Sequence, residues 1–133
     1  MKRLFIILAL LGFLGCSYKQ IRQEVIGLSA SDVKNADKKY VKVFEADRNA
    51  LFNKTEKIIK KMHAEITGRD RKEFFISAYG FDKKYANCIN TTQAGVLMTR
   101  LETGETEIAV ASPNSELAKF VSGRLFGELS DKK

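Results

Sequence analysis

The sequence predicts a single small α+β domain, a two-layer sandwich in which two helices pack on one face of an antiparallel sheet. Segments 48–63 and 113–129 repeat apolar residues at helical spacing, whereas several shorter segments alternate in the manner of half-buried strands. Helices and strands do not alternate regularly, which argues against the βαβ units of a parallel sheet. The expected order of elements is therefore β-α-β-β-β-β-α.

Residues 1–15 have the plan of a secretory leader. Lys2 and Arg3 give a positive start, and an apolar run from Leu4 to Leu14 follows. This run is shorter than the about 20 residues that a helix needs to span a bilayer, so we interpret it as a signal peptide. A buried core helix is the alternative, but the run lacks the polar face that such a helix repeats.

The Gly15-Cys16 pair that ends the leader resembles the cleavage site of bacterial lipoprotein signals. The resemblance implies that Cys16 is lipidated and becomes the new amino terminus. Two or more acyl chains give stable membrane anchoring, whereas a single chain binds marginally. Ser17 stands where Asp would usually signal retention in the inner membrane. The resemblance therefore implies an anchor in the outer membrane, with the protein facing the periplasm.

Residues 16–39 are expected to form the lipidated amino terminus and a loosely packed tether, and residues 40–133 the α+β domain. Within the tether, Ser29 or Ser31 is suited to cap a short helix that runs through Asn35. Such a tether would hold the domain clear of the bilayer.

The domain is expected to open with a strand at 40–46, followed by its clearest helix at 48–63. Asp47 suits the amino-terminal cap of that helix, where a carboxylate also matches the helix dipole. Glu56 lies one turn before Lys60 and offsets part of a basic face. The apolar stripe of the helix consists of Leu51, Thr55, Ile58, Ile59 and Met62. The opposite face, called the lysine face below, consists of Lys54, Lys57, Lys60 and Lys61.

Four further strands are expected. A short strand is expected at 64–67 and is followed by a turn at 68–70. A hairpin is expected from strands at 96–101 and 106–111, joined by a turn in which Gly104 supplies a positive φ. Between them lies a strand at 73–81, whose two faces follow from the period of two. One face carries Phe74, Ile76 and Ala78, and the other carries Phe75, Ser77, Tyr79 and Phe81.

The last helix is expected to open at Ser112-Pro113, because proline is tolerated in a first helical turn. Its apolar stripe consists of Leu117, Val121 and Leu125. Gly123 and Gly127 lower its intrinsic helix propensity, and close packing on the sheet would explain their presence.

The chain resembles small bacterial lipoproteins of unknown function, whose domain begins with a strand, a long helix and a second strand. The residues that carry this resemblance are 43–47, Met62 and 64–66. The Ser112-Pro113 junction before a terminal helix fits the same group. The chain is also loosely similar to the helix-grip domains of outer-membrane assembly lipoproteins. The shared residues are core-packing patterns, so the resemblance implies a fold and transfers no active site.

No pattern indicates catalysis, a metal or a cofactor. His63 is the only histidine, which excludes a zinc site of several histidines, and nothing local supports a Cys88–His63 catalytic pair. With Cys16 lipidated, Cys88 has no partner within the chain and is expected to be a buried small hydrophobe, with an intermolecular disulfide as the alternative. Phosphate-binding loops, dinucleotide fingerprints and nucleophile elbows are absent. Three hairpin carboxylates, Glu102, Glu105 and Glu107, are interpreted as solvated.

Two surfaces are candidates for binding. Phe75, Tyr79 and Phe81 form an aromatic patch if they are exposed together, although a loop or the tether would cover them in the alternative interpretation. The lysine face, above all Lys54, Lys57 and Lys61, suits anionic headgroups, unless it is an ordinary solvated helix face.

The precursor has a net charge of +7, and losing Lys2 and Arg3 with the leader lowers it to +5. An exported basic protein meets anionic lipids or envelope polymers more readily than nucleic acid. We expect a membrane-anchored envelope lipoprotein that is a non-enzymatic protein-interaction or structural module with an envelope protein as partner. The alternative is a small-ligand or lipid carrier, whose cavity would be lined by Phe74, Ile76, Val96 and Met98. The oligomeric state is left open.

Overall fold

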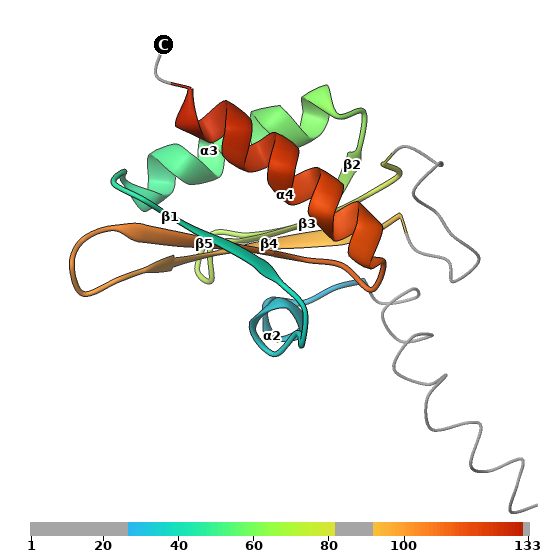
Figure 1. Cartoon of the computed structure of the whole chain (residues 1–133), viewed down its shortest axis with the longest axis horizontal. Helices are drawn as coiled ribbons and strands as arrows, with labels where there is room; N and C mark the ends of the chain where they lie inside the picture. Colours follow the sequence, from blue (N-terminus) through green and yellow to red (C-terminus); the bar gives the residue numbers. More distant parts are fainter. Residues whose placement is uncertain (1–26, 82–91, 132–133) are drawn as a thin grey trace, which may run out of the picture.

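The computed structural model describes residues 27–81 and 92–131, and every element below lies within these ranges. Three helices surround one five-stranded antiparallel sheet (Figure 1). The helices are α2 (Ala30–Lys34), α3 (Arg48–Lys61) and α4 (Ser115–Ser130). The strands are β1 (Tyr40–Phe44), β2 (Glu65–Asp70), β3 (Phe75–Tyr79), β4 (Ala94–Arg100) and β5 (Thr106–Ala111).

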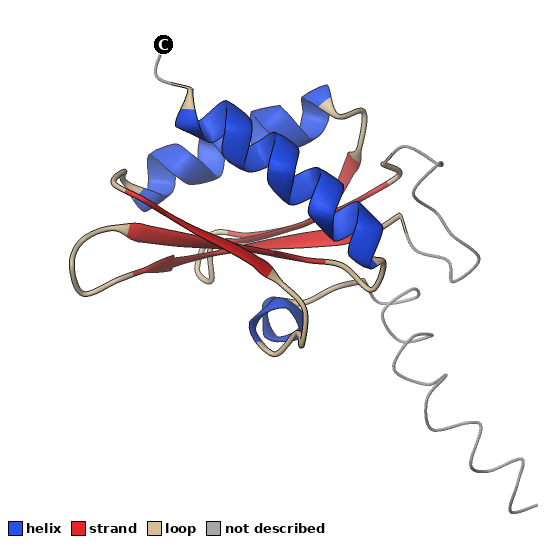
Figure 2. Ribbon diagram, in the orientation of Figure 1, coloured by secondary structure: helices blue, strands red, loops and turns tan. Residues whose placement is uncertain are grey.

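The strands lie in the order β1-β5-β4-β3-β2, so β1 and β2 form the two opposite edges. Helix α3 carries the chain across the sheet from the β1 edge to the β2 edge. The strands β2 to β5 then return step by step, each antiparallel to the one before, until β5 pairs with β1. Figure 2 shows α3 and α4 on one face of this sheet and α2 on the other.

The α+β class and the antiparallel sheet are confirmed, but the detailed architecture differs from the prediction. The predicted order omits α2, and the predicted two layers become three. The physical reason is that the second face of the sheet is also apolar and must be kept from water.

The main core lies between the sheet and the pair α3 and α4. The predicted stripes of both helices face it, with Leu51 and Ile59 of α3 and Leu117 of α4 buried. Asp47 caps α3 by accepting a hydrogen bond from the Ala50 N–H at 3.0 Å, as predicted. These residues pack on Ile76, Val96, Met98, Ile108 and Val110 of the central strands.

Helix α4 begins later than predicted, at Ser115. The side-chain oxygen of Asn114 accepts hydrogen bonds from the N–H groups of Glu116 and Leu117, at 3.1 and 3.2 Å. Asn114 is therefore the amino-terminal cap, and Pro113 lies outside the helix, because the amide side chain satisfies donors that the first turn leaves free.

A second, smaller core lies between α2 and the other face of the sheet. Val33 is fully buried there, and Leu28 packs beside it against Phe75, Ala109 and Ala111. The predicted cap is confirmed: Ser29 accepts from the Asp32 N–H at 3.2 Å and donates its own N–H to the Asp32 carboxylate at 2.9 Å. The prediction of a loosely packed tether is therefore wrong for Leu28 to Val33, which pack on the sheet, whereas Asp37, Lys38 and Lys39 are exposed.

Two glycine interpretations are corrected. The predicted turn at 68–70 is part of β2, where the pairing register shifts between Ile66 and Gly68 and the chain turns only after Asp70. A Cβ on Gly68 would collide with the Ser77 hydroxyl, so a larger residue in the bulge would force the Ser77 side chain to move. Gly123 and Gly127 are exposed, and a Cβ at either position would meet no atom within 4 Å. Close packing on the sheet therefore does not explain them.

Candidate functional site

The predicted aromatic patch is not assembled. Phe75 is buried beneath α2, Phe81 is buried in the main core, and Tyr79 is 41% exposed. Strand β3 ends at Tyr79, and Gly80 has a φ of +79°, which interrupts the alternation of the strand. The chain thereby returns Phe81 to the helical side, so the placement of Phe75 and Phe81 on one shared face is wrong. Phe75 is covered by Leu28 and Val33 from the predicted tether, in agreement with the alternative interpretation.

Tyr79 interacts with the neighbouring edge strand. Its hydroxyl donates a hydrogen bond to the Glu65 carboxylate at 3.1 Å, across the β2–β3 pair. This hydrogen bond raises the pKa of Tyr79 above its ordinary value, and the negative charge of Glu65 and slight burial act in the same direction. Tyr79 is the one member of the predicted patch that remains available at the surface.

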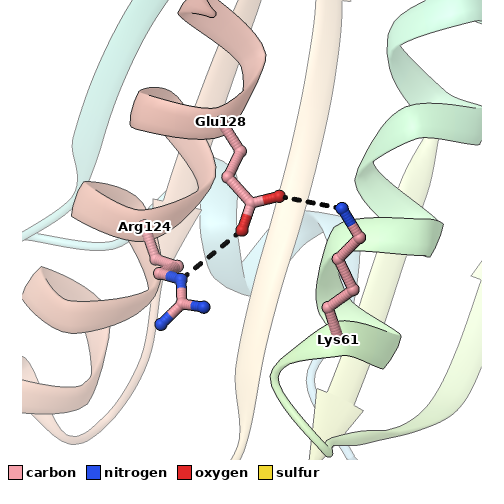
Figure 3. Close-up of polar contacts among 3 residues, drawn as sticks. All are labelled: Lys61, Arg124 and Glu128. Carbon is pink, nitrogen blue, oxygen red and sulfur yellow. Dashed lines mark hydrogen bonds and ion pairs between the residues drawn. The ribbon is translucent and has the colours of Figure 1, made fainter.

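The lysine face is exposed, and only part of it is neutralised. Lys61 Nζ lies 3.4 Å from Glu128 Oε2 of α4, and Arg124 Nε lies 3.4 Å from the other oxygen of the same carboxylate (Figure 3). Glu56 pairs with Arg69 of β2 and not with Lys60. Among the described residues, Lys54, Lys57 and Lys60 form no ion pair, so α3 presents uncompensated positive charge along one side.

The side chains considered for catalysis or metal binding are not brought together. His63 is exposed and follows Met62, the carboxyl-terminal cap of α3. It adopts a φ of 58°, and its N–H donates a hydrogen bond to the Lys60 carbonyl at 3.1 Å. Glu105 accepts a hydrogen bond from the Thr103 hydroxyl at 2.8 Å within the β4–β5 turn. Residues 27–81 and 92–131 contain no group of three or more His, Cys, Asp and Glu arranged to hold a metal ion. Cys16 and Cys88 lie outside the described residues.

The residues expected to line a carrier cavity are packed against one another. Ile76, Val96 and Met98 are at most 1% exposed and belong to the main core. Phe74 is enclosed by aromatic and cationic neighbours: the Phe52 ring meets it edge-on at 5.7 Å, and the Arg48 guanidinium stacks 3.7 Å from its centroid. These four side chains therefore fill the space between the helices and the sheet.

Strand β1 presents exposed apolar side chains that the sequence pattern does not predict. Tyr40, Val41 and Val43 are 38%, 44% and 43% exposed, and with Tyr79 they make up the exposed large hydrophobic residues of the described chain. Val41 and Val43 lie opposite Ala109 and Glu107, on the face that carries α2. We call Tyr40, Val41 and Val43 the β1 edge. Its sequence signal was a short strand with apolar residues on both faces.

Comparison with known proteins adds no family. The chain matches no protein-family model, and none of the curated proteins is significantly similar to it. Among the helices that the structure describes, none is long and apolar enough to cross a membrane.

Proposed function

We propose that this protein is a membrane-anchored bacterial envelope lipoprotein that acts through protein–protein contact and has no catalytic activity. The observation that carries the contact role is the β1 edge, where three large apolar side chains are exposed on an edge strand that has a strand neighbour on one side only. Exposed apolar residues gathered on one element are typical of interaction sites, whereas single scattered ones need no explanation.

The filled core favours this role over the carrier alternative. A lipid or ligand carrier needs an apolar cavity that encloses most of its cargo. The four residues expected to line such a cavity, Phe74, Ile76, Val96 and Met98, contact one another in the main core instead. The helical layer of α3 and α4 then serves as a rigid support that holds the sheet and its β1 edge in shape.

The membrane anchor rests on the leader and on Cys16. A diacylglycerol thioether together with an amide-linked chain would hold the protein stably, and palmitate is a suitable label for these chains. The absence of Asp after Cys16 supports the outer membrane and its periplasmic side. The uncompensated Lys54, Lys57 and Lys60 of α3 would add attraction to anionic headgroups once the protein is anchored.

The anchor is tested by the Cys16→Ser variant. We expect the wild-type protein to incorporate labelled palmitate and to sediment with membranes, and we expect the variant to do neither. Cys88→Ser is the matched control, because it removes the other cysteine and should retain both properties. A wild-type protein without label, or a variant that stays with the membrane, would contradict the anchor.

The contact role is tested by crosslinking in native membranes, followed by mass spectrometry of the purified full-length lipoprotein. We expect a protein to be crosslinked at the β1 edge and no stoichiometric lipid beyond the covalent chains to be extracted. Recovery of bound lipid without any protein partner would favour the carrier alternative instead.

A further inference from the structure

The two edges of the sheet are protected to very different extents. At the β2 edge the register shifts at a bulge, and Glu65, Arg69 and Asp70 place charges along the strand. At the β1 edge all five residues pair with β5 without a shift. Bulges and charges are the common devices that prevent an edge strand from pairing with another chain, so β1 is the edge that remains open to pairing.

The single charge within β1 does not block this edge. Lys42 Nζ donates a hydrogen bond to the Ser130 hydroxyl at 2.8 Å and lies 5.4 Å from the centroid of the Phe44 ring. The ammonium group is therefore held over the side of the sheet that carries α4. Val41 and Val43, which point to the other side, remain exposed.

We propose that β1 pairs antiparallel with β1 of a second copy of this chain, so that one continuous sheet runs through a twofold-symmetric dimer. The inference rests on the proposed contact function, because it names the partner of the same β1 edge. Symmetry restricts the register, since hydrogen-bonded and non-hydrogen-bonded pairs alternate in an antiparallel ladder. A symmetric pair must therefore place one residue opposite its own copy, and the centre of β1 offers Val41, Lys42 or Val43.

The register centred on Lys42 matches both apolar and charged residues. It places Val41 opposite Val43 of the second copy, and Tyr40 opposite Phe44 of the second copy. Immediately outside the strand, it places Lys39 opposite Glu45 of the second copy. Each of these three pairs occurs twice, because the twofold axis repeats it.

The charged pair is available in the monomer. Lys39 Nζ donates to the Lys34 carbonyl at 2.7 Å and keeps two further N–H donors. Glu45 is exposed and forms no ion pair with any residue in the described ranges. Cross-strand pairs of opposite charge stabilise a ladder, so Lys39 and Glu45 would fix the two ends of the shared strand pair.

The other two symmetric registers match less well. Centring on Val41 would place the charged Lys38 and Lys39 opposite Phe44 and Val43 of the second copy. Centring on Val43 would place Val41 opposite Glu45 of the second copy. The Lys42-centred register has one conflict, the Lys42 pair itself, and each of these ammonium groups is directed toward its own Ser130.

The contact is short, and membrane anchoring would favour it. A strand of five residues forms few inter-chain contacts, which is typical of weak association. Two copies held on one membrane surface have a raised effective concentration, which promotes pairing without new contacts. The dimer is therefore best tested with the full-length chain in living bacteria.

The register is tested by crosslinking through Lys42→Cys in a Cys88→Ser background. We expect a short membrane-permeant bismaleimide to join two copies at position 42, whereas Lys57→Cys on α3 is the control that should not be joined. Adding Val41→Lys or Val43→Glu should lower the joined fraction about fivefold, because either variant places a charge opposite a valine. Combining both should restore it, since the register then sets each new lysine opposite a new glutamate.

The restoration is specific, because the other symmetric registers would set lysine opposite lysine at position 41 or glutamate opposite glutamate at position 43. Both positions are more than two fifths exposed, so the variants should keep the circular dichroism spectrum of the wild type.

In an otherwise wild-type chain, Lys42→Thr should tighten the dimer about fivefold by removing the like-charge pair.

Two results would overturn the dimer: position 42 joined no better than position 57, or no restoration in the double variant. A photoreactive amino acid at position 43 separates this failure from failure of the proposed function. Capture of a different envelope protein there would reject self-pairing and retain the contact role. Capture of no protein at all would reject both.

Discussion

At the scale of single residues, Thr55 is a buried side chain whose hydroxyl is not satisfied. It is fully buried on the apolar stripe of α3, and its Oγ1 has no hydrogen-bond partner in the described structure. A buried hydroxyl without a partner costs free energy, because it has lost its hydrogen bonds to water.

We expect Thr55→Val to stabilise the protein by about 1 kcal/mol, since valine has nearly the same shape and no polar atom to desolvate. Urea unfolding followed by circular dichroism measures this change. Thr55→Ser is the matched control, which keeps the hydroxyl and removes the methyl group, and it should be destabilising. A destabilised valine variant would show that the hydroxyl has a partner.

The Tyr79–Glu65 hydrogen bond should make the stability of the folded protein depend on pH. The pKa of Tyr79 is raised in the folded protein, mainly by its hydrogen bond to Glu65. An unfolded tyrosine titrates near pH about 10. The pair therefore contributes stability that is fully present below that pH and is lost as the pH rises through the folded pKa.

We expect Glu65→Gln to lower the pKa of Tyr79 toward the ordinary value, because the amide has no negative charge to oppose the phenolate. Absorbance titration of the tyrosines measures this shift. The chain has four tyrosines, so Tyr79→Phe is needed to assign the transition that moves. An unchanged titration in Glu65→Gln would contradict the role of Glu65.

At the scale of secondary-structure elements, α2 depends on a glycine in the strand beneath it. A Cβ on Gly95 would lie 2.6 Å from Cγ2 of Val33 and 3.1 Å from Cε2 of Phe75. Neither atom belongs to a long flexible side chain, so α2 or the ring would have to move. Gly95 therefore sets how closely α2 approaches the sheet.

We expect Gly95→Ala to destabilise the protein by about 1 to 3 kcal/mol through this overpacking. Chemical denaturation is the measurement, and the double variant Gly95→Ala with Val33→Ala supplies the control. Because Val33→Ala removes the methyl group that collides, the two changes together should cost less than their sum. Simple additivity would indicate that the two positions do not contact.

In helix α4 an alanine should have the opposite effect to that at Gly95, because Gly123 lies on the exposed face with open space around it. We expect Gly123→Ala to stabilise the protein by about 1 kcal/mol, since alanine restricts the unfolded chain and clashes with nothing. A rise in the thermal midpoint measures it, and Gly127→Ala should behave in the same way. A fall in the midpoint would indicate a contact at this face.

At the scale of the whole molecule, the sheet separates two cores of unequal size. The main core is formed by α3, α4 and the sheet, whereas α2 holds the smaller core with Leu28 and Val33 as its main apolar contacts. Regions with few buried apolar contacts open with less free energy than the global unfolding reaction. The molecule should therefore open first at α2.

We expect amide hydrogen exchange of the native protein to be fastest in α2 and slowest in β3, β4 and β5, which have strand neighbours on both sides. Exchange followed by mass spectrometry measures this order. Val33→Ala should accelerate exchange in α2 and in the sheet face beneath it while leaving α3 unchanged. Uniform exchange across all helices would indicate one inseparable cooperative unit.

Local patterns were sufficient for much of the fold. The stripe of α3, the cap at Asp47 and the hairpin strand 106–111 are properties of neighbouring residues, so they could be predicted from spacing alone. The shift at Gly68 and the later start of α4 were missed. Each depends on a residue distant in the chain or on a competing cap, which periodicity does not reveal.

The candidate site was predicted less well than the fold. The exposure of Lys54, Lys57 and Lys61 followed from their helical spacing, but the exposure of β1 depended on which strand became the sheet edge. Tyr40, Val41 and Val43 look like ordinary core residues in the sequence. They are exposed because the sheet pairs β1 with β5 on one side only.

By itself, the sequence determined the class of fold and the apolar faces of the two long helices, because side-chain periodicity is a local property of the backbone. The leader and Cys16 are also sequence signals, and the anchor that they predict awaits its test. Only the tertiary structure decided that α2 covers the second face, that the aromatic patch is divided and that β1 is an edge strand of the sheet. Strand order and layer packing follow from contacts between distant segments, and these contacts exist only after the chain has folded.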